Sequence, residues 1–238
     1  MKAIFFDFGG TLDSNAIPWR QNFYAIYKKE FKTLDENTFA KAFFDSDDNL
    51  HLRHDLSKAN LEETVKLQVL DVFKYLKIDN ADAAEKIIKT FISNSRKHFC
   101  DSIPILENLK SKGLKLGIIS NFYGNLKPIL EGENLLKYFD VVADSGQVGF
   151  IKPDKEIFEW ALKRTNTTPA QSAMVGDASH RDMKGAALMG MPHFWLCGNN
   201  DKEEFKRLYP KGIILNNLAE LPKKLQSFSE TSDGENSQ

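Results

Sequence analysis

Short apolar runs alternate with amphipathic segments along most of the chain. The runs begin near Ile4 and return from Leu114 onward, and each ends at a polar residue or a glycine. Continuous apolar runs of this length are typical of strands buried on both faces of a parallel sheet. Between them, residues 104–113 and 153–164 place their apolar side chains on one helical stripe. This alternation predicts a doubly wound α/β core with right-handed crossovers.

Residues 15–100 follow a different pattern. Strand-like runs are absent from this stretch, and apolar residues recur there at helical spacing. The recurring positions include Phe23, Ile26 and Tyr27, then Leu61, Val65, Val69 and Val72, and finally Ile87, Ile88, Phe91 and Ile92. We therefore predict a helical domain at 15–100, inserted into a core made of 1–14 and 101–226. The small and polar residues at 227–238 are predicted to form a flexible tail.

Composition narrows the classes of function. The 238 residues carry 32 Lys and Arg against 33 Asp and Glu, so no overall charge attracts nucleic acid or an acidic membrane surface. We expect neither a signal peptide nor a membrane span, because the apolar stretch at the start is short and is broken at Asp7. Cys100 and Cys197 lack the spacing of metal ligands, and we expect reduced, partly buried thiols in a cytoplasmic protein. The sequence leaves the oligomeric state open.

Polar groups stand where the predicted strands end. Ligands of open α/β sheets bind outside the carboxyl ends of the strands. In chain order, the groups found there are Asp7, Ser120 with Asn121, Lys152 after a loop, and Asp177 followed by Asp182. Because parallel strands end at one edge of the sheet, we expect these side chains to meet.

This set of residues has a simple chemical interpretation. Carboxylates that meet at a sheet edge repel one another unless a hard cation joins them, and Mg²⁺ accepts carboxylates together with phosphate oxygens. Thr11, Ser120 and Lys152 supply donors and positive charge for a phosphoryl group, as do the amides of residues 9–11. Asp7 is then left as a nucleophile able to form an aspartyl-phosphate. The pattern predicts in-line phosphoryl transfer.

The same residues, in this order, resemble the haloacid dehalogenase superfamily of hydrolases. Its first motif, D-x-D-x-T, matches residues 7–11, with Gly9 in place of the second acid. The other three motifs match Ser120, then Lys152 with Pro153, and then Gly176 and Asp177 with Asp182. The resemblance covers roughly residues 1–220 and implies a Rossmann-like core with a helical cap of the C1 type.

The resemblance also implies an activity and a set of site residues. It implies hydrolysis of a small phosphorylated metabolite, with Mg²⁺ held by Asp7, the Gly9 carbonyl and Asp177, and with Asp182 supporting the metal. Gly10 and Asn121 are expected to contact the phosphoryl group. The resemblance assigns no fixed role to His180 or Arg181.

Gly9 raises a difficulty, because the family's second acid protonates the leaving group and then activates water. One solution is another proton donor. Asp13 is close in sequence, although a structural role suits it better, and the cap offers His51 and His54. Arg53, between these histidines, could bind an anionic group of the substrate.

Two further solutions stay open. The chemistry could differ, as in phosphonoacetaldehyde hydrolases, where a cap lysine such as Lys28, Lys29 or Lys32 would form a Schiff base, or as in the metal-independent haloacid dehalogenases. Alternatively, the protein could be a catalytically poor phospholigand-binding or regulatory module. The aromatic residues of the cap are expected to form its core or its interface with the α/β domain; they are Trp19, Phe23, Tyr24, Phe43 and Phe44.

Overall fold

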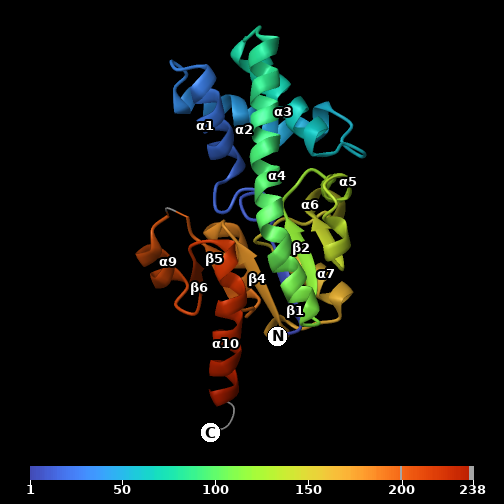
Figure 1. Ribbon diagram of the computed structural model, residues 1–238, viewed down its shortest axis with the longest axis vertical. Helices are drawn as coiled ribbons and strands as arrows, with labels where there is room; N and C mark the ends of the chain where they lie inside the picture. The colour runs from blue at the N-terminus through green and yellow to red at the C-terminus, as the bar shows by residue number, and fades with distance from the viewer. Residues whose placement is uncertain (199, 236–238) are drawn as a thin grey trace.

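The computed structural model describes residues 1–198 and 200–235. An α/β core lies below a group of helices that includes the upper half of a long helix (Figure 1). The strands are β1 (Ala3–Phe6), β2 (Lys115–Ser120), β3 (Val141–Asp144), β4 (Ser172–Gly176), β5 (His193–Leu196) and β6 (Ile213–Leu215). Among the described residues, no helix combines the length and the hydropathy that a membrane span requires.

The strands form one parallel sheet in the order β3-β2-β1-β4-β5-β6. Each predicted apolar run is a strand of this sheet, so the prediction of a doubly wound, Rossmann-like α/β fold is confirmed. The strand order reverses beside β1: the chain runs from β1 through β2 to β3 on one side and then returns to β4 on the other. Such a switch point opens a crevice at the carboxyl ends of the strands.

Helices cover both faces of the sheet. Ile4 and Phe6 of β1 point into one apolar cluster, whereas Ala3 and Phe5 point into a second. The first cluster includes residues of α4 (Ala81–Ser111), α5 (Leu126–Gly132) and α10 (Leu221–Glu235), and the second those of α7 (Lys155–Thr165), α8 (Lys184–Leu188) and α9 (Lys202–Leu208). A short helix, α6 (Ser145–Val148), follows β3. Burial on both faces is the reason that these strands lack alternation.

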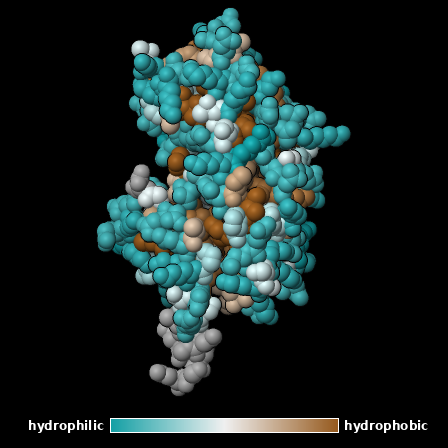
Figure 2. Space-filling view, viewed as in Figure 1, coloured by the Kyte–Doolittle hydropathy of each residue, from teal (hydrophilic) through white to brown (hydrophobic). Residues whose placement is uncertain are grey.

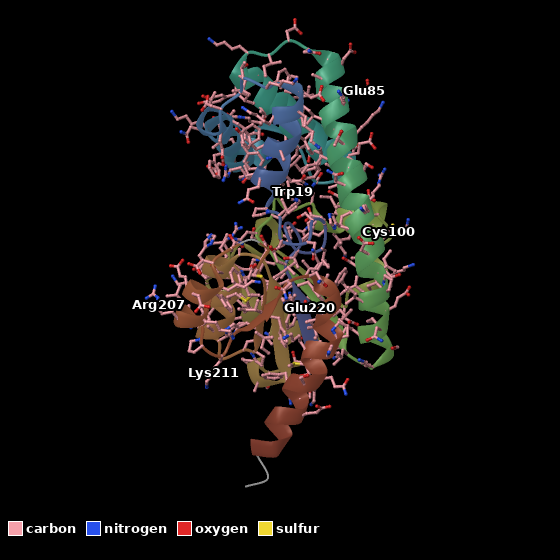
Figure 3. The ribbon with its side chains drawn as sticks, turned by 60° about the vertical axis from the view of Figure 1, so that its left-hand side comes forward. Trp19, Glu85, Cys100, Arg207, Lys211 and Glu220 are labelled. Carbon is pink, nitrogen blue, oxygen red and sulfur yellow. The ribbon has the colours of Figure 1, made fainter. Side chains whose placement is uncertain are left out.

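The cap consists of α1 (Trp19–Glu30), α2 (Glu36–Arg53), α3 (Leu61–Leu76) and the first part of α4. Its interior is rich in aromatic side chains, and Phe23 stacks on Phe91 with ring centroids 4.1 Å apart. Trp19 lies where the cap meets the core (Figure 3). Phe44 differs from the other expected aromatic residues, because half of its surface is exposed.

The structure departs from the sequence predictions at α4. The predicted boundary at residue 100 falls inside this single helix, whose first part packs on α1 and α3 and whose last part packs on β2 and α10. Pro104 lies within the helix and does not end it. Cys100, expected to be partly buried, is exposed on α4, whereas Cys197 is buried; both are free thiols. Figure 3 shows Cys100 on the side of α4 that faces away from the core.

A second departure concerns the predicted tail at 227–238. The chain continues as α10 to Glu235, so the flexible tail was predicted to begin too early, and residues 236–238 lie outside the described part. Leu221, Leu225 and Phe228 are spaced to place one apolar stripe against the sheet, and Phe228 contacts the ring of Phe194. Figure 2 shows that hydrophilic residues cover most of the visible surface of both the α/β core and the cap.

Candidate active site

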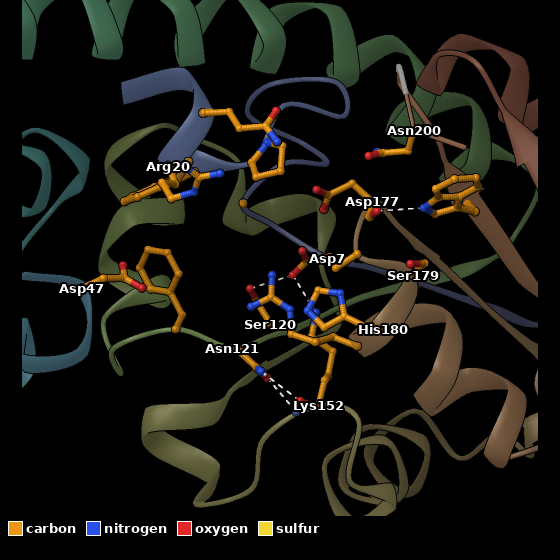
Figure 4. A pocket seen from close by; sticks show the side chains of 18 of the residues that line it. Asp7, Arg20, Asp47, Ser120, Asn121, Lys152, Asp177, Ser179, His180 and Asn200 are labelled. Atoms are coloured by element: carbon orange, nitrogen blue, oxygen red, sulfur yellow. Dashed lines mark hydrogen bonds and ion pairs between the residues drawn. The ribbon is translucent and has the colours of Figure 1, made fainter. Parts of the chain in front are cut away.

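Asp7 lies at the centre of the crevice, directly after β1. Its backbone N–H donates to the carbonyl of Val175 (2.9 Å), which ties it to the end of β4. Its carboxylate is buried, and one oxygen, Oδ1, accepts hydrogen bonds from Ser120 Oγ (2.8 Å) and Lys152 Nζ (2.7 Å). Figure 4 shows Ser120, at the end of β2, and Lys152, from the loop between α6 and α7, on the same side of the site as Asp7. The other oxygen, Oδ2, accepts no hydrogen bond from a described residue.

Lys152 is a fully buried cation held between two carboxylates. Its Nζ lies 2.7 Å from Asp7 Oδ1 and 2.7 Å from Asp182 Oδ1. Burial by itself lowers the pKa of the ammonium group, but the charges of Asp182 and Asp7 more than offset it, so the pKa of Lys152 is above its usual value. Asn121 fixes the backbone of this lysine: its Oδ1 accepts from Lys152 N (2.7 Å), and its Nδ2 donates to Lys152 O (3.1 Å). Asn121 thus positions Lys152, a role that the sequence did not reveal.

Three acids form a cluster beside this lysine. Asp7, Asp177 and Asp182 each offer an oxygen, and these oxygens all lie within 4.8 Å of one another. Burial, then the nearby charges of Asp7 and Asp182, raise the pKa of Asp177 well above its usual value. Burial also raises the pKa of Asp182 to about 6, although Lys152 opposes the shift. Crowded, buried carboxylates of this kind suit a hard divalent cation.

The members of the cluster are not equivalent. Asp182 uses both oxygens within the protein, because Oδ1 meets Lys152 and Oδ2 accepts from Ala178 N (2.9 Å). Asp177 makes one long contact, with Thr11 Oγ1 at 3.4 Å. Asp7 and Asp177 therefore have oxygens to offer to a cation, whereas Asp182 holds the loop and the lysine.

The turn after Asp7 differs from expectation. The Gly10 N–H donates to Asp13 Oδ1 (2.7 Å) and the Thr11 N–H to Phe8 O (3.2 Å), so neither amide is free for a phosphate. Gly10 has φ +92°, and a Cβ there would come within 2.6 Å of the Asp177 carboxylate. The absence of a Cβ at Gly10 thus leaves room for the Asp177 carboxylate, while the Gly10 amide is engaged by Asp13. The Thr11 hydroxyl likewise meets Asp177 and is buried.

Asp13 has the structural role that the sequence favoured. It is completely buried and accepts hydrogen bonds from Gly10 N, Ser14 Oγ and the indole N–H of Trp19. Burial raises the pKa of Asp13 to about 6, against the effect of these donors. The indole that it holds stands beside Gly9: a Cβ on Gly9 would lie 3.3 Å from Trp19 Nε1.

A cleft of about 870 Å³ opens between these residues and the cap. From the core it is lined by Asp7, Gly9, Ser120, Asn121, Lys152, Asp177, His180 and Arg181, and from the cap by Trp19, Arg20, Phe43, Phe44 and Asp47, among others. Trp19 and Phe44, expected only to pack, also line the cleft. Asp47 of α2 accepts hydrogen bonds from Tyr123 Oη, a core residue, and from Gln68 Nε2 (3.3 Å).

The cap residues singled out from the sequence do not reach this cleft. Arg53 pairs with Asp45 (2.8 Å) and Asp71 (3.4 Å), and His54 Nε2 lies 3.1 Å from Asp71 Oδ1. These partners draw both side chains toward α3, and His51 is exposed at the end of α2. Lys152 is the one lysine among the described residues that line the cleft. The structure therefore gives no support to a Schiff base formed by Lys28, Lys29 or Lys32.

Sequence reasoning missed two groups that the cap supplies and one that the core supplies. Arg20, Asp47 and Tyr123 line the cleft, but they belong to no motif and lie far apart in the chain. The spacing of apolar residues in α1 and α2 tells which face of each helix is buried, but not which polar residue at its edge faces the core. Trp195, whose indole donates to Asp177 O (2.8 Å), was assigned only to a strand.

Comparison with known proteins agrees with this arrangement. A sequence model of the haloacid dehalogenase-like hydrolases matches residues 4–196. Haloacid dehalogenase-like hydrolase domain-containing protein 3 of Bos taurus is 40% identical over 119 residues, or 50% of this chain and 47% of that protein. The glyceraldehyde 3-phosphate phosphatase of Methanothermobacter thermautotrophicus is 41% identical over 98 residues, 39% of this chain and 42% of that protein. These matches span about half of each relative.

A solved structure extends the likeness to nearly the whole chain. The crystal structure of a HAD phosphatase from Thermococcus onnurineus has a TM-score of 0.59 and 25% sequence identity. The match covers 94% of this chain and 98% of that one.

Proposed function

We propose that this chain, which belongs to the haloacid dehalogenase-like hydrolase family, is a magnesium-dependent phosphatase of a small phosphorylated metabolite. One observation carries the proposal: a buried carboxylate, Asp7, meets a buried lysine and a serine at one oxygen and an acid cluster beside it. Relatives named as phosphatases support the same class of reaction.

Asp7 is the proposed nucleophile. One oxygen of its carboxylate forms a bond to phosphorus while the bond from phosphorus to the leaving oxygen breaks, which yields an aspartyl-phosphate and an alkoxide that takes up a proton from water. Ser120 and Lys152 then hold the negative charge of the transferred group, since both already point at Asp7. Attack of water on phosphorus releases phosphate and restores Asp7.

Asp7, Asp177 and the Gly9 carbonyl are the proposed magnesium ligands. Mg²⁺ held by these groups would neutralise the repulsion between Asp7 and the incoming phosphate and would polarise the phosphoryl oxygens. Asp182 keeps Lys152 and the loop of Asp177 in place, because both of its oxygens are engaged. The acid cluster gives a reason for a metal, since three buried carboxylates face one ammonium group.

A second candidate function rests on Gly9. This residue lines the cleft without a side chain, so it supplies no proton for a leaving alkoxide. General acid catalysis contributes about 10²- to 10⁴-fold in rate. A protein that binds a phosphorylated ligand without fast turnover therefore stays as the alternative to the phosphatase.

Turnover of para-nitrophenyl phosphate tests the proposal. Its leaving group needs no proton, so the activity should appear with Mg²⁺, disappear with EDTA and fall on the order of 10³-fold or more in Asp7→Asn. Asp55→Asn, an exposed acid of the cap, is the matched control. Full activity in Asp7→Asn would refute the aspartyl-phosphate route, and metal-dependent binding of a phosphate mimic without turnover would favour the binding protein.

A further inference from the structure

Arg181 is a cation of the cleft that the proposed reaction does not use. It lies on the π-helical turn η3 (Ser179–Met183), between the two acids of the fourth motif, and its side chain lines the cleft. Its Nε is shielded from solvent and has no hydrogen-bond partner among the described residues. A buried N–H of a charged group costs free energy when it has no hydrogen-bond acceptor. The Nε of Arg181 therefore needs an acceptor that another molecule would supply.

The surroundings of Arg181 show where that acceptor would be. Arg181 of the core and Asp47 of the cap line the same cleft, and the charge of Arg181 opposes the rise that burial causes in the pKa of Asp47 and of Asp177. No described carboxylate is within ion-pair distance of Arg181: Asp47 is instead bonded to Tyr123 and Gln68. By contrast, Lys152 already has two carboxylate partners, Asp7 and Asp182.

A second guanidinium enters the cleft from the cap. Arg20 of α1 lines the same cleft, and its contact with Glu36 (2.8 Å) uses only one of its donors. Figure 4 places Arg20 on the cap side of Asp7. The transferred phosphoryl group is already served by Ser120 and Lys152, so these arginines provide more positive charge than that group requires.

We propose that Arg181, assisted by Arg20, binds a second oxyanion of the substrate, so that the substrate is a phosphate ester bearing a carboxylate or another phosphate group. This inference rests on the proposed phosphatase function. The planar guanidinium fork matches the two oxygens of a carboxylate or phosphate, and the shielded position of Nε strengthens such a bond. The cleft volume of about 870 Å³ limits the substrate to a small metabolite.

Matched pairs of substrates test the proposal. 3-Phosphoglycerate and glycerol 3-phosphate differ by a carboxylate in place of an alcohol, and fructose 1,6-bisphosphate and fructose 6-phosphate differ by a second phosphate. In at least one pair, kcat/KM of the wild-type protein should favour the more acidic member by about tenfold to a hundredfold, mainly through KM. Arg181→Met should remove this preference, and Arg181→Lys should keep part of it. Lys184→Met, an exposed charge of the same segment outside the cleft, should retain it.

The outcomes separate this inference from the proposed function. An absent preference in the wild type, or a preference unchanged in Arg181→Met, overturns the inference even if para-nitrophenyl phosphate is hydrolysed. If Arg181 instead served only to attract Asp47 during cap closure, Arg181→Met and Asp47→Asn would slow both members of a pair equally, which also overturns it. If no substrate is turned over, calorimetry on Asp7→Asn with Mg²⁺, with and without Arg181→Met, measures the same affinity ratio without catalysis.

Discussion

The two walls of the cleft differ in how firmly their residues are held. On the core wall, Lys152 is 3% exposed and Asp7 is 4% exposed, and the two form an ion pair that Asp182 extends. On the cap wall, Phe44 is 50% exposed and Arg20 keeps most of its donors free. Rigid, desolvated charges suit stabilisation of a transition state, whereas exposed groups suit selection among substrates. We therefore assign the chemistry to the buried charges of the core wall, and the specificity to the cap wall together with Arg181, which faces it from the core.

The largest effect is expected on the core wall. Lys152→Met removes the cation between Asp7 and Asp182, so turnover should fall about 10²- to 10³-fold. It also leaves two buried acids facing each other, which should destabilise the metal-free protein by about 3–5 kcal/mol. Added Mg²⁺ should recover part of that loss. Kinetics and thermal unfolding measure both effects, with exposed Lys155→Met as control. A variant that loses turnover but no stability would show that the ion pairs contribute nothing to folding.

The next-largest effect is expected for substitutions of Gly9, a core-wall residue that lies beside Trp19 of the cap. Gly9→Asp and Gly9→Ala both place a Cβ about 3.3 Å from Trp19 Nε1, so they share a steric cost, and only the first adds a carboxyl group. If the natural protein lacks a proton donor, the kcat of Gly9→Asp on glycerol 3-phosphate should exceed that of Gly9→Ala about 10- to 100-fold. Equal rates in the two variants would mean that another group already donates the proton.

Metal binding should depend on pH in a direction that the acid cluster fixes. The pKa of Asp182 is raised to about 6 and that of Asp177 also lies above its usual value. The folded, metal-free protein therefore holds protons more tightly than the unfolded chain does, and its stability falls as the pH rises from about 4 toward 6. Mg²⁺ competes with these protons, so it should raise Tm by several degrees at pH 7.5 and by much less at pH 5.

Thermal unfolding with and without Mg²⁺ at both pH values checks this dependence. Asp177→Asn, which removes a proposed ligand, should abolish the Mg²⁺ effect at pH 7.5. An equal effect of Mg²⁺ at the two pH values would show that the ion binds away from the cluster.

The difference between the core wall and the cap wall also explains which site residues the sequence could predict and which it could not. Asp7, Ser120, Lys152, Asp177 and Asp182 come together because parallel strands end at one edge, and strand ends can be read from apolar runs. Lys152 differs from the others, since it lies in the loop between α6 and α7 and only its motif pointed to it. To predict where these residues lie, one does not need to know the orientation of each helix about its axis.

The errors arise where side-chain direction decides. Arg53 was expected in the site because of its place in the chain, but the rotation of α2 directs it to Asp45 and Asp71. Gly10 was expected to bind phosphate, but Asp13, three residues on, accepts its N–H. A side chain and a ligand can compete locally for one backbone amide, and the hydrophobic pattern does not reveal this competition.

The smallest predicted effect tests how the two walls are joined. Tyr123 of the core donates to Asp47 of the cap, and Asn125 Nδ2, two residues on, donates to Ala59 O (3.0 Å) and Thr64 Oγ1 (2.7 Å). Tyr123→Phe removes one of these bonds and should cost about 1–2 kcal/mol, or about 2–8 °C in Tm. Burial raises the pKa of Asp47 and the hydroxyl of Tyr123 opposes that shift, so the loss of stability should shrink as the pH falls and Asp47 takes up a proton. Tyr75→Phe, on the exposed side of α3, serves as control. A loss of stability that does not change with pH would mean that the hydroxyl serves packing alone, and that the walls are joined by Asn125 and apolar contacts without the charge of Asp47.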